Sequence, residues 1–248
     1  MFKKIFNGQV MLALALIFLS VAFYLICYVV FHDARYIFMT VLSNIGFAFF
    51  EVFLVTLVIH RLLLFRERRA LLRKMNMVIG IFFIELGTDL IRACSKFDAN
   101  AASIIRQLAS VKDLSGKEFD DISRVLRKYN GAIDYAAGDV PALKDLLAAK
   151  RGFLLTLLGN ANLLEHDSFT NLLWATFHLT DELSRRKDLR ALPETDQKHI
   201  AIDINRTYGA CIIEWLAYMK HLKSHYPYLF SFAMRTNPFD AAASVEVV

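Results

Sequence analysis

The sequence predicts an all-α membrane protein, built from an antiparallel two-helix transmembrane hairpin and a cytoplasmic helical bundle. Three observations lead to this prediction. Two long apolar stretches lie near the N-terminus, a basic segment follows them, and the rest of the chain repeats its apolar side chains with the 3.6-residue period of a helix. Alternating apolar and polar runs closed by hairpin dipeptides, the pattern typical of β-strands, do not occur in the sequence.

The two apolar stretches are long enough to cross a bilayer. Residues 9–31 carry no charge, and residues 37–60 carry only Glu51 as a fixed charge. Because about 20 apolar residues span the bilayer core as a helix, each stretch predicts one crossing. The first stretch exceeds the apolar core of a signal peptide and no small-x-small cleavage motif follows it, so we expect it to be retained. The few residues between the stretches allow only a tight turn, which makes the two helices antiparallel.

Basic residues indicate the orientation of this hairpin. Lys3 and Lys4 precede the first span, whereas the turn holds only Arg35, offset by Asp33. The basic residues that follow the second span are Arg61, Arg66, Arg68, Arg69, Arg73 and Lys74. Since Lys and Arg near the ends of a span stay on the cytoplasmic side, we expect an inner-membrane protein with both termini in the cytoplasm.

The net charge of +5 is unevenly distributed along the chain. Residues 1–75 hold nine Lys or Arg and three Asp or Glu, a net +6, whereas residues 76–248 hold 20 and 21, a net −1. The excess forms a membrane-proximal basic collar, made of Arg66, Arg68, Arg69, Arg73 and Lys74. Such a collar attracts anionic lipid headgroups by about 1 kcal/mol per basic residue, or serves only to set the topology. It does not extend over the rest of the chain, so we expect no nucleic-acid partner.

The chain divides into a transmembrane hairpin, residues 1–66, and a cytoplasmic all-α domain, residues 67–248. Apolar periodicity with proline and glycine punctuation predicts helices in this domain at residues 76–96, 100–112, 117–137, 141–159, 167–186 and 193–226. The helix over 117–137 has a weak point at Asn130-Gly131, and the aromatic tail after Pro227 is expected to dock on the domain. The three cysteines, Cys27, Cys94 and Cys211, are expected to be reduced and buried.

Residues 76–96 are apolar almost all round, with Glu85, Asp89 and Arg92 in one polar stripe. A third span here would move the C-terminal domain across the membrane, but charges near the middle of a span are costly. We therefore expect a cytoplasmic helix that neighbouring helices or an oligomer interface bury. The four-residue spacing makes Glu85 and Asp89 repel each other, and Arg92 neutralises one of them. We interpret the three as a buried charge network, with a cation site as the sharper alternative.

The second span has a polar face. Thr40, Asn44 and Glu51 share one side of the helix, and Ser20 and Tyr24 form a similar stripe on the first span. An ionised carboxylate in mid-membrane is costly, so Glu51 needs protonation, a partner or water. Three interpretations stay open. Glu51 hydrogen-bonds to Ser20 or Tyr24 or to a neighbouring subunit, a ring of Glu51 lines a cation or proton path in an oligomer, or a partner protein supplies a basic residue.

Histidines and acids are dense in the last two predicted helices and just before them: Glu165, His166, Asp167, His178, Asp181, Glu182, His199, Asp203, Glu214, His221 and His225. Di-metal bundle enzymes use Glu-x-x-His pairs that point inward, and this chain has no Glu-x-x-His. At 100° per residue, His178 lies opposite the apolar face of its helix. His199, Asp203, Glu214 and His221 form a stripe roughly 120° from the apolar face of theirs. We therefore expect no metal ligand, no cofactor and no catalytic residue, and we interpret the second stripe as facing a partner.

The stretch LLEHDSFTNLLWATFHLTDELSRR and the tail HLKSHYPYLFSFAMRTNPFD resemble a family of uncharacterised prokaryotic two-span membrane proteins with a helical cytoplasmic domain. The resemblance covers most of the chain from the second span onward. It implies one intact natural domain and no particular activity, fold or binding residue.

Walker, GxGxxG, GxSxG and HExxH motifs are absent from the sequence, so we expect a protein that is not an enzyme. The leading hypothesis is a membrane-anchored interaction or scaffold module that acts as a homo-oligomer or in a heteromeric complex. The alternative is an oligomeric cation or proton channel whose pore is lined by the Thr40–Asn44–Glu51 face of the second span.

Overall fold

The computed structural model describes residues 2–160, 163 and 166–246, with side chains described from residue 10 onward except at 67–74. Its ordered elements are all helices, and the described residues contain no strand, only one isolated bridge between Asp98 and Ile133. The all-helical fold class is therefore confirmed. The chain separates into two compact units, Met1–Arg68 and Arg69–Val248, and the boundary expected from sequence lay between residues 66 and 67.

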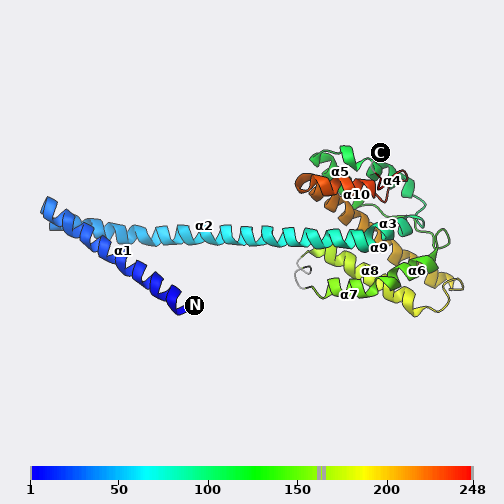
Figure 1. Cartoon of the computed structure of the whole chain (residues 1–248), viewed down its shortest axis with the longest axis horizontal. Coiled ribbons are helices and arrows are strands. Elements are labelled where there is room, and N and C mark those ends of the chain that lie inside the picture. The colour runs from blue at the N-terminus through cyan, green and yellow to red at the C-terminus, as the bar shows by residue number, and fades with distance from the viewer. Residues whose placement is uncertain (1, 161–162, 164–165, 247–248) are drawn as a thin grey trace. The chain divides into compact units, whose positions relative to one another are not determined.

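The first unit contains α1 (Phe2–Phe31) and the N-terminal part of α2 (Ala34–Phe82) (Figure 1). His32 joins the two helices in the left-handed backbone region, with a φ of 54°. Asp33 then caps α2, because its Oδ1 accepts hydrogen bonds from the backbone N–H groups of Arg35 and Tyr36 at 3.0 Å each.

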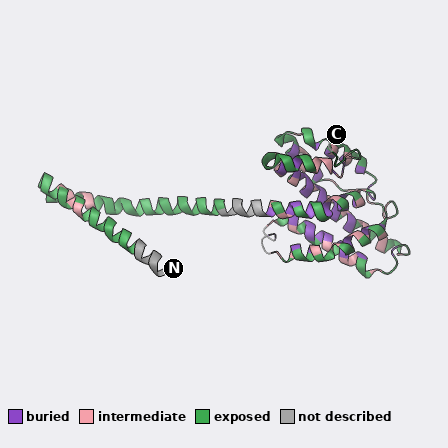
Figure 2. Cartoon of the chain, in the orientation of Figure 1, coloured by how far each residue is buried: buried purple, intermediate pink, exposed green. Residues whose placement is uncertain are grey.

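Two segments of this unit are long and apolar enough to cross a membrane, by length and composition. They are Val10–Phe31 and Ala34–Arg66, with 22 and 33 residues, and neither has buried residues in its most apolar window. Figure 2 shows both segments exposed over most of their described length, with partly covered residues where the two helices meet near the turn.

The second unit is a bundle of helices around α9 (Glu194–His225), which packs on α3, α5, α8 and α10. The other helices are α3 (Thr88–Ser95), α4 (Ala101–Ala109), α5 (Gly116–Leu126), α6 (Val140–Ala149), α7 (Arg151–Leu158), α8 (Asp167–Arg185) and α10 (Pro227–Arg235). The helix α8 lies alongside α9 (Figure 1). The side chains of Tyr208 and Trp215 on α9 are the largest that this core buries.

The segment expected as a helix over 76–96 is the end of α2, a π-helical turn η1 (Phe83–Gly87) and α3. Phe82, Leu86 and Leu90 from this segment are fully buried, so it is a core element of the second unit. The turn at Gly87 needs glycine, since a Cβ there would lie 2.5 Å from the ring of Phe83. The two candidate spans found among the described residues do not include this segment.

Two predicted helices are not continuous over the ranges that their apolar pattern indicated. The helix over 117–137 starts with a capping box of Ser115 and Glu118 but ends at Leu126. The following residues form a loop that Asp98 holds, since its Oδ1 accepts from Ala132 N at 2.9 Å and its Oδ2 from the hydroxyl of Tyr129. The helix over 141–159 is divided at Lys150 into α6 and α7.

The tail and the cysteines follow the prediction in part. Phe239 is buried in edge contact with Trp215, at 4.9 Å between ring centroids, so the tail docks on the domain. Cys94 and Cys211 are buried free thiols, and burial raises the pKa of Cys94 to about 12. Cys27 on α1 is only partly covered among the described residues.

Candidate functional site

The polar stripe of the first unit joins α1 to α2 near their turn. Asn44 Nδ2 donates to the hydroxyl of Tyr24 at 3.3 Å, and Thr40 Oγ1 donates to the carbonyl oxygen of Tyr36 at 2.9 Å. Ser20 and Glu51 are exposed. Because Asn44 faces Tyr24, Glu51 lies about two helical turns further from the hairpin turn, beyond the reach of Tyr24. The structure thus brings Tyr24 and Asn44 together and leaves the Glu51 carboxyl on the surface of the single chain.

The basic collar is described only in part. Arg66 is exposed on α2. The side chains of Arg68, Arg69, Arg73 and Lys74 lie outside the described residues.

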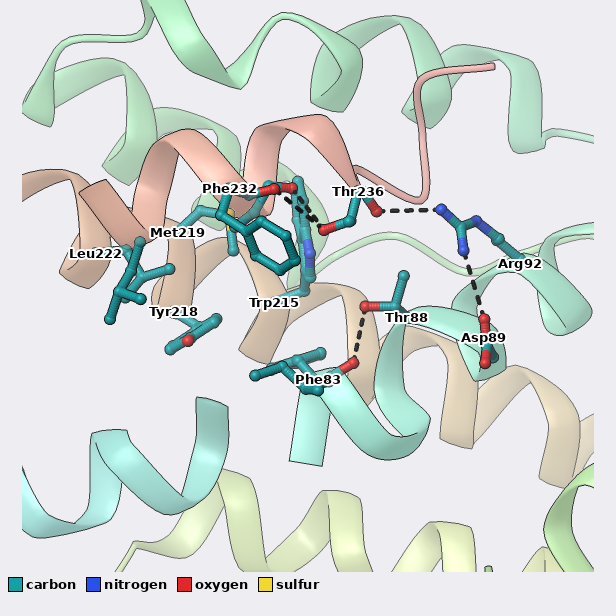
Figure 3. Close-up of a pocket in the computed structure, with 13 residues that line it drawn as sticks. Phe83, Thr88, Asp89, Arg92, Trp215, Tyr218, Met219, Leu222, Phe232 and Thr236 are labelled. Atoms are coloured by element: carbon teal, nitrogen blue, oxygen red, sulfur yellow. Dashed lines mark hydrogen bonds and ion pairs between the residues drawn. The ribbon is translucent and has the colours of Figure 1, made fainter. Parts of the chain in front are cut away.

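The charges of the segment 76–96 lie on the surface, which corrects the expectation of a buried network. Glu85 pairs at 2.8 Å with Lys150, the residue between α6 and α7, and Asp89 pairs with Arg92 at 3.4 Å. Arg92 also donates to the carbonyl oxygen of Thr236 at 3.1 Å (Figure 3). The side chains of Glu85, Asp89 and Arg92 are 48%, 61% and 47% exposed, because the opposite side of the segment faces the core. Exposed pairs of this kind contribute little stability.

The four residues expected to form a partner-facing stripe on α9 are not one exposed surface. His199 is exposed and His221 is half-buried, whereas Asp203 and Glu214 are 2% and 4% exposed. The reason is the central position of α9, whose sides are covered by different helices along its length. His221 Nδ1 contacts Asn76 Nδ2 at 3.3 Å, and burial is the main cause that lowers the pKa of His221.

Two members of that stripe instead meet two residues of α8. Nε2 of His178 lies 3.2 Å from Oδ2 of Asp203, and Nε2 of His199 lies 3.5 Å from the same oxygen. Glu182 is also close, with Oε1 4.0 Å from His178 Nε2 and Oε2 3.7 Å from His199 Nε2. We call these four residues the His–acid cluster. His178 and Glu182, like His199 and Asp203, are four residues apart and therefore on one face of their helix.

Two arginines donate hydrogen bonds to the carboxylates of this cluster. Arg206 donates to Oδ1 of Asp203 at 2.8 Å, and Arg186 donates to Oε2 of Glu182 at 2.5 Å and to both carboxylate oxygens of Asp196. The hydrogen bond from Arg186 is the first cause that lowers the pKa of Glu182. Oδ2 of Asp203 is buried and accepts no hydrogen bond in the described part of the chain.

Sequence reasoning named all four residues without joining them. His178, His199 and Asp203 were each projected on their own helix and Glu182 was only named, whereas the pairing of α8 with α9 determines which of them meet. The signal that was available is the repeated spacing His-x-x-x-Glu in one helix and His-x-x-x-Asp in the next.

An exposed apolar surface lies on another side of the second unit. Two neighbouring grooves share Ile84, Tyr218, Leu222 and Leu229 in their walls, so they are continuous. Figure 3 shows the groove between η1, α9 and α10. We define the α2–α10 face by its exposed apolar residues, which are Met77, Ile81, Ile84, Tyr228, Leu229 and Phe232.

Comparison with known proteins places the chain in a family. Residues 71–235 match the model described as "Uncharacterized protein MJ1433, C-terminal helical domain", and residues 3–63 match "MJ1433, N-terminal helical domain". The chain belongs to the MJ1433 family. It is 42% identical over 233 residues to Uncharacterized protein MJ1433 of Methanocaldococcus jannaschii, which covers 94% of this chain and 93% of the relative. No solved structure matches it. The resemblance to an uncharacterised family with helical domains is thereby confirmed, and neither description states an activity.

Proposed function

We propose that this chain is a membrane-anchored interaction module, with α1 and the first part of α2 as a bilayer-spanning hairpin and the helical domain in the cytoplasm. The observation that supports it most is the pair of apolar segments, Val10–Phe31 and Ala34–Arg66, with no buried residue in their most apolar windows. An apolar surface of this extent needs a lipid or protein cover. Helices satisfy their own backbone hydrogen bonds, as the bilayer core requires.

The sequence supports the orientation of this anchor. Basic residues follow the second segment and are scarce in the turn, which favours both termini on the cytoplasmic face of an inner membrane. In that position Arg66 and the other residues of the collar meet anionic headgroups.

We further propose that the α2–α10 face docks a second copy of this chain. Met77, Ile81 and Ile84 are 69%, 45% and 71% exposed, and their spacing of four and three residues is that of a helix–helix contact seam. Chains anchored by the same hairpin share one orientation in the bilayer, so the membrane-spanning parts of their α2 helices run parallel. This face replaces the stripe on α9 as the proposed docking surface, since two residues of that stripe are buried.

A matched pair of variants tests the docking surface. Ile84→Asp places a charge in the face, and Ile202→Asp places the same charge on α9, where Ile202 is 58% exposed. We expect native mass spectrometry in nanodiscs to give an oligomer for the original chain and for Ile202→Asp, and a monomer for Ile84→Asp. An oligomer that survives Ile84→Asp would exclude this face.

A channel is the second candidate, because the exposed carboxyl of Glu51 lies within the segment Ala34–Arg66. In an oligomer this residue would supply a ring of acids to a pore. Replacement of Glu51 by Gln should then change cation flux into proteoliposomes. Equal flux in both proteins, measured against protein-free liposomes, would reject the channel.

A further inference from the structure

We propose that the His–acid cluster binds one divalent transition-metal ion of the zinc class, which links α8 to α9. The donors are His178 and Glu182 from α8 and His199 and Asp203 from α9. Two imidazole nitrogens and two carboxylate oxygens are a donor set that zinc accepts. This inference concerns the second unit alone and does not depend on the proposed membrane anchor.

The distances within the cluster fit an ion at its centre. Zinc lies 2.0–2.2 Å from nitrogen and oxygen ligands, so tetrahedral donors are about 3.4 Å apart. The contacts of the two histidine nitrogens with Asp203 Oδ2 are 3.2 and 3.5 Å. The nearest potential donor atoms of His178, Glu182 and His199 all lie within 4.8 Å of one another. The two contacts with Asp203 thus have the spacing of metal ligands, whereas Glu182, at 4.0 and 3.7 Å from the two Nε2 atoms, would have to move closer to ligate the ion.

The buried oxygen of Asp203 provides an independent reason. Its side chain is 2% exposed, and Oδ1 is held by Arg206, whereas Oδ2 accepts no hydrogen bond in the described residues. A buried carboxylate oxygen without a donor is costly. Oδ2 lies against the Nε2 atoms of both histidines, so a cation shared with them would satisfy it.

The charge around the cluster also favours a cation. The carboxylates are Glu182 and Asp203 of the cluster and the neighbouring Asp196, which shares Arg186 with Glu182, and the guanidinium groups paired with them are those of Arg186 and Arg206. Three negative charges against two positive charges leave one net negative charge. Neutral imidazoles, the form that ligates metals, do not balance it.

The arrangement of outer partners is that of a built metal site. Ligands of metals are oriented by hydrogen bonds from a surrounding shell, and here Arg206 orients Asp203 while Arg186 orients Glu182. Four protein ligands fill a tetrahedral ion, which is typical of a structural site rather than a catalytic one. The ion would link the C-terminal half of α8 to the first half of α9, and solvent reaches it past His178 and His199, which are 46% and 51% exposed.

Zinc binding to the full-length purified protein, carrying no histidine tag, tests this site. The protein is stripped with a chelator, dialysed and titrated with zinc chloride, and the metal content is measured by elemental analysis. We expect one zinc ion per chain. Cobalt(II) in place of zinc should give the intense visible bands of tetrahedral coordination, whereas an octahedral surface-bound ion gives weak ones.

Matched histidine pairs identify the ligands. The double variant His178→Ala/His199→Ala should lower zinc affinity by more than about 100-fold, the upper end of what losing an outer-shell partner costs. His221→Ala/His225→Ala removes a stacked pair with ring centroids 4.6 Å apart elsewhere on α9, and should leave the affinity unchanged. Arg206→Ala should lower it about 10- to 100-fold. Both histidines of the cluster are half-exposed, so their removal spares the core.

Three results would overturn the proposal. They are no zinc retained by the original protein, an octahedral cobalt spectrum, or equal affinity in the His178→Ala/His199→Ala variant. Loss of zinc only from His221→Ala/His225→Ala would assign the ion to that pair instead.

Discussion

Oδ2 of Asp203 lies 3.2 Å from Nε2 of His178 across the interface of α8 and α9, yet this oxygen accepts no hydrogen bond in the described part of the chain. The first prediction uses this contrast. In metal-free protein, Asp203→Asn should change the thermal midpoint little, because the amide oxygen can still accept from Arg206 and the variant loses a buried charge whose Oδ2 accepts no hydrogen bond.

With zinc present the original protein should be the more stable of the two. Zinc at 100 times its dissociation constant stabilises the original protein by about 2.7 kcal/mol and stabilises the variant, which lacks one ligand, by less. Thermal unfolding with zinc and with chelator measures both values. A midpoint that ignores zinc in both proteins would contradict the prediction.

The second prediction concerns the pH dependence of stability at His221. Burial and the neighbouring His225 lower the pKa of His221 below its ordinary value of 6.5. As pH falls, the unfolded chain therefore takes up this proton before the folded one does. The stability that neutral His221 contributes is complete above about pH 6.5 and is lost as pH falls from there through the folded-state pKa.

Thermal midpoints between pH 8 and pH 5, with chelator present, test this prediction. The original protein should lose more stability over that range than His221→Asn, which has no ionisable ring and keeps a polar group near Asn76. Parallel curves for the two proteins would show that His221 does not contribute to the pH dependence of stability.

The third prediction concerns the loop after α5. Asp98 is 6% exposed and accepts hydrogen bonds from Tyr129, Asn100 and Ala132. Asp98→Ala should lower the free energy of unfolding by about 1.5–3 kcal/mol, the range for a hydrogen bond to a charged group, or by more. Asp134→Ala is the control in the same loop, since its exposed side chain accepts one local bond from Ala136, and it should cost less than about 1 kcal/mol. Denaturant unfolding gives both values.

The fourth prediction compares a buried and an exposed residue of the π-helical turn η1. Leu86 is fully buried and Ile84, two residues earlier, is 71% exposed. Leu86→Ala should cost about 2–5 kcal/mol, because it leaves a cavity in the core, and Ile84→Ala should cost little. Equal effects in denaturant unfolding would contradict the packing of this turn in the second unit.

The sequence predicted most of the helices correctly, but it did not predict which residues of different helices contact one another. The apolar period located α8, α9 and the end of α2 because each buries a continuous face. It missed the break at Lys150, since α6 and α7 carry apolar residues on both sides of it, and it missed the loop after Leu126, which polar contacts to Asp98 hold.

The contacts at the candidate sites were not predicted for the same reason, because they join residues of different helices. Projection on one helix placed His178 away from the apolar face of α8, and that is where the structure has it, at the exposed edge. Only the register between α8 and α9 brings Asp203 within 3.2 Å of it, and no period within one helix contains that register. The charge of Glu85 was evident from the sequence, but its partner Lys150 was not, because Lys150 is distant in the chain and lies 2.8 Å from it only in the folded domain.

The most direct test of the proposed function is the extraction of membranes from cells that express the full-length chain. We predict that the protein stays in the membrane pellet after alkaline carbonate treatment and leaves it only with detergent. Recovery in the carbonate supernatant would contradict the bilayer anchor and would assign the apolar surfaces of Val10–Phe31 and Ala34–Arg66 to a protein cover instead.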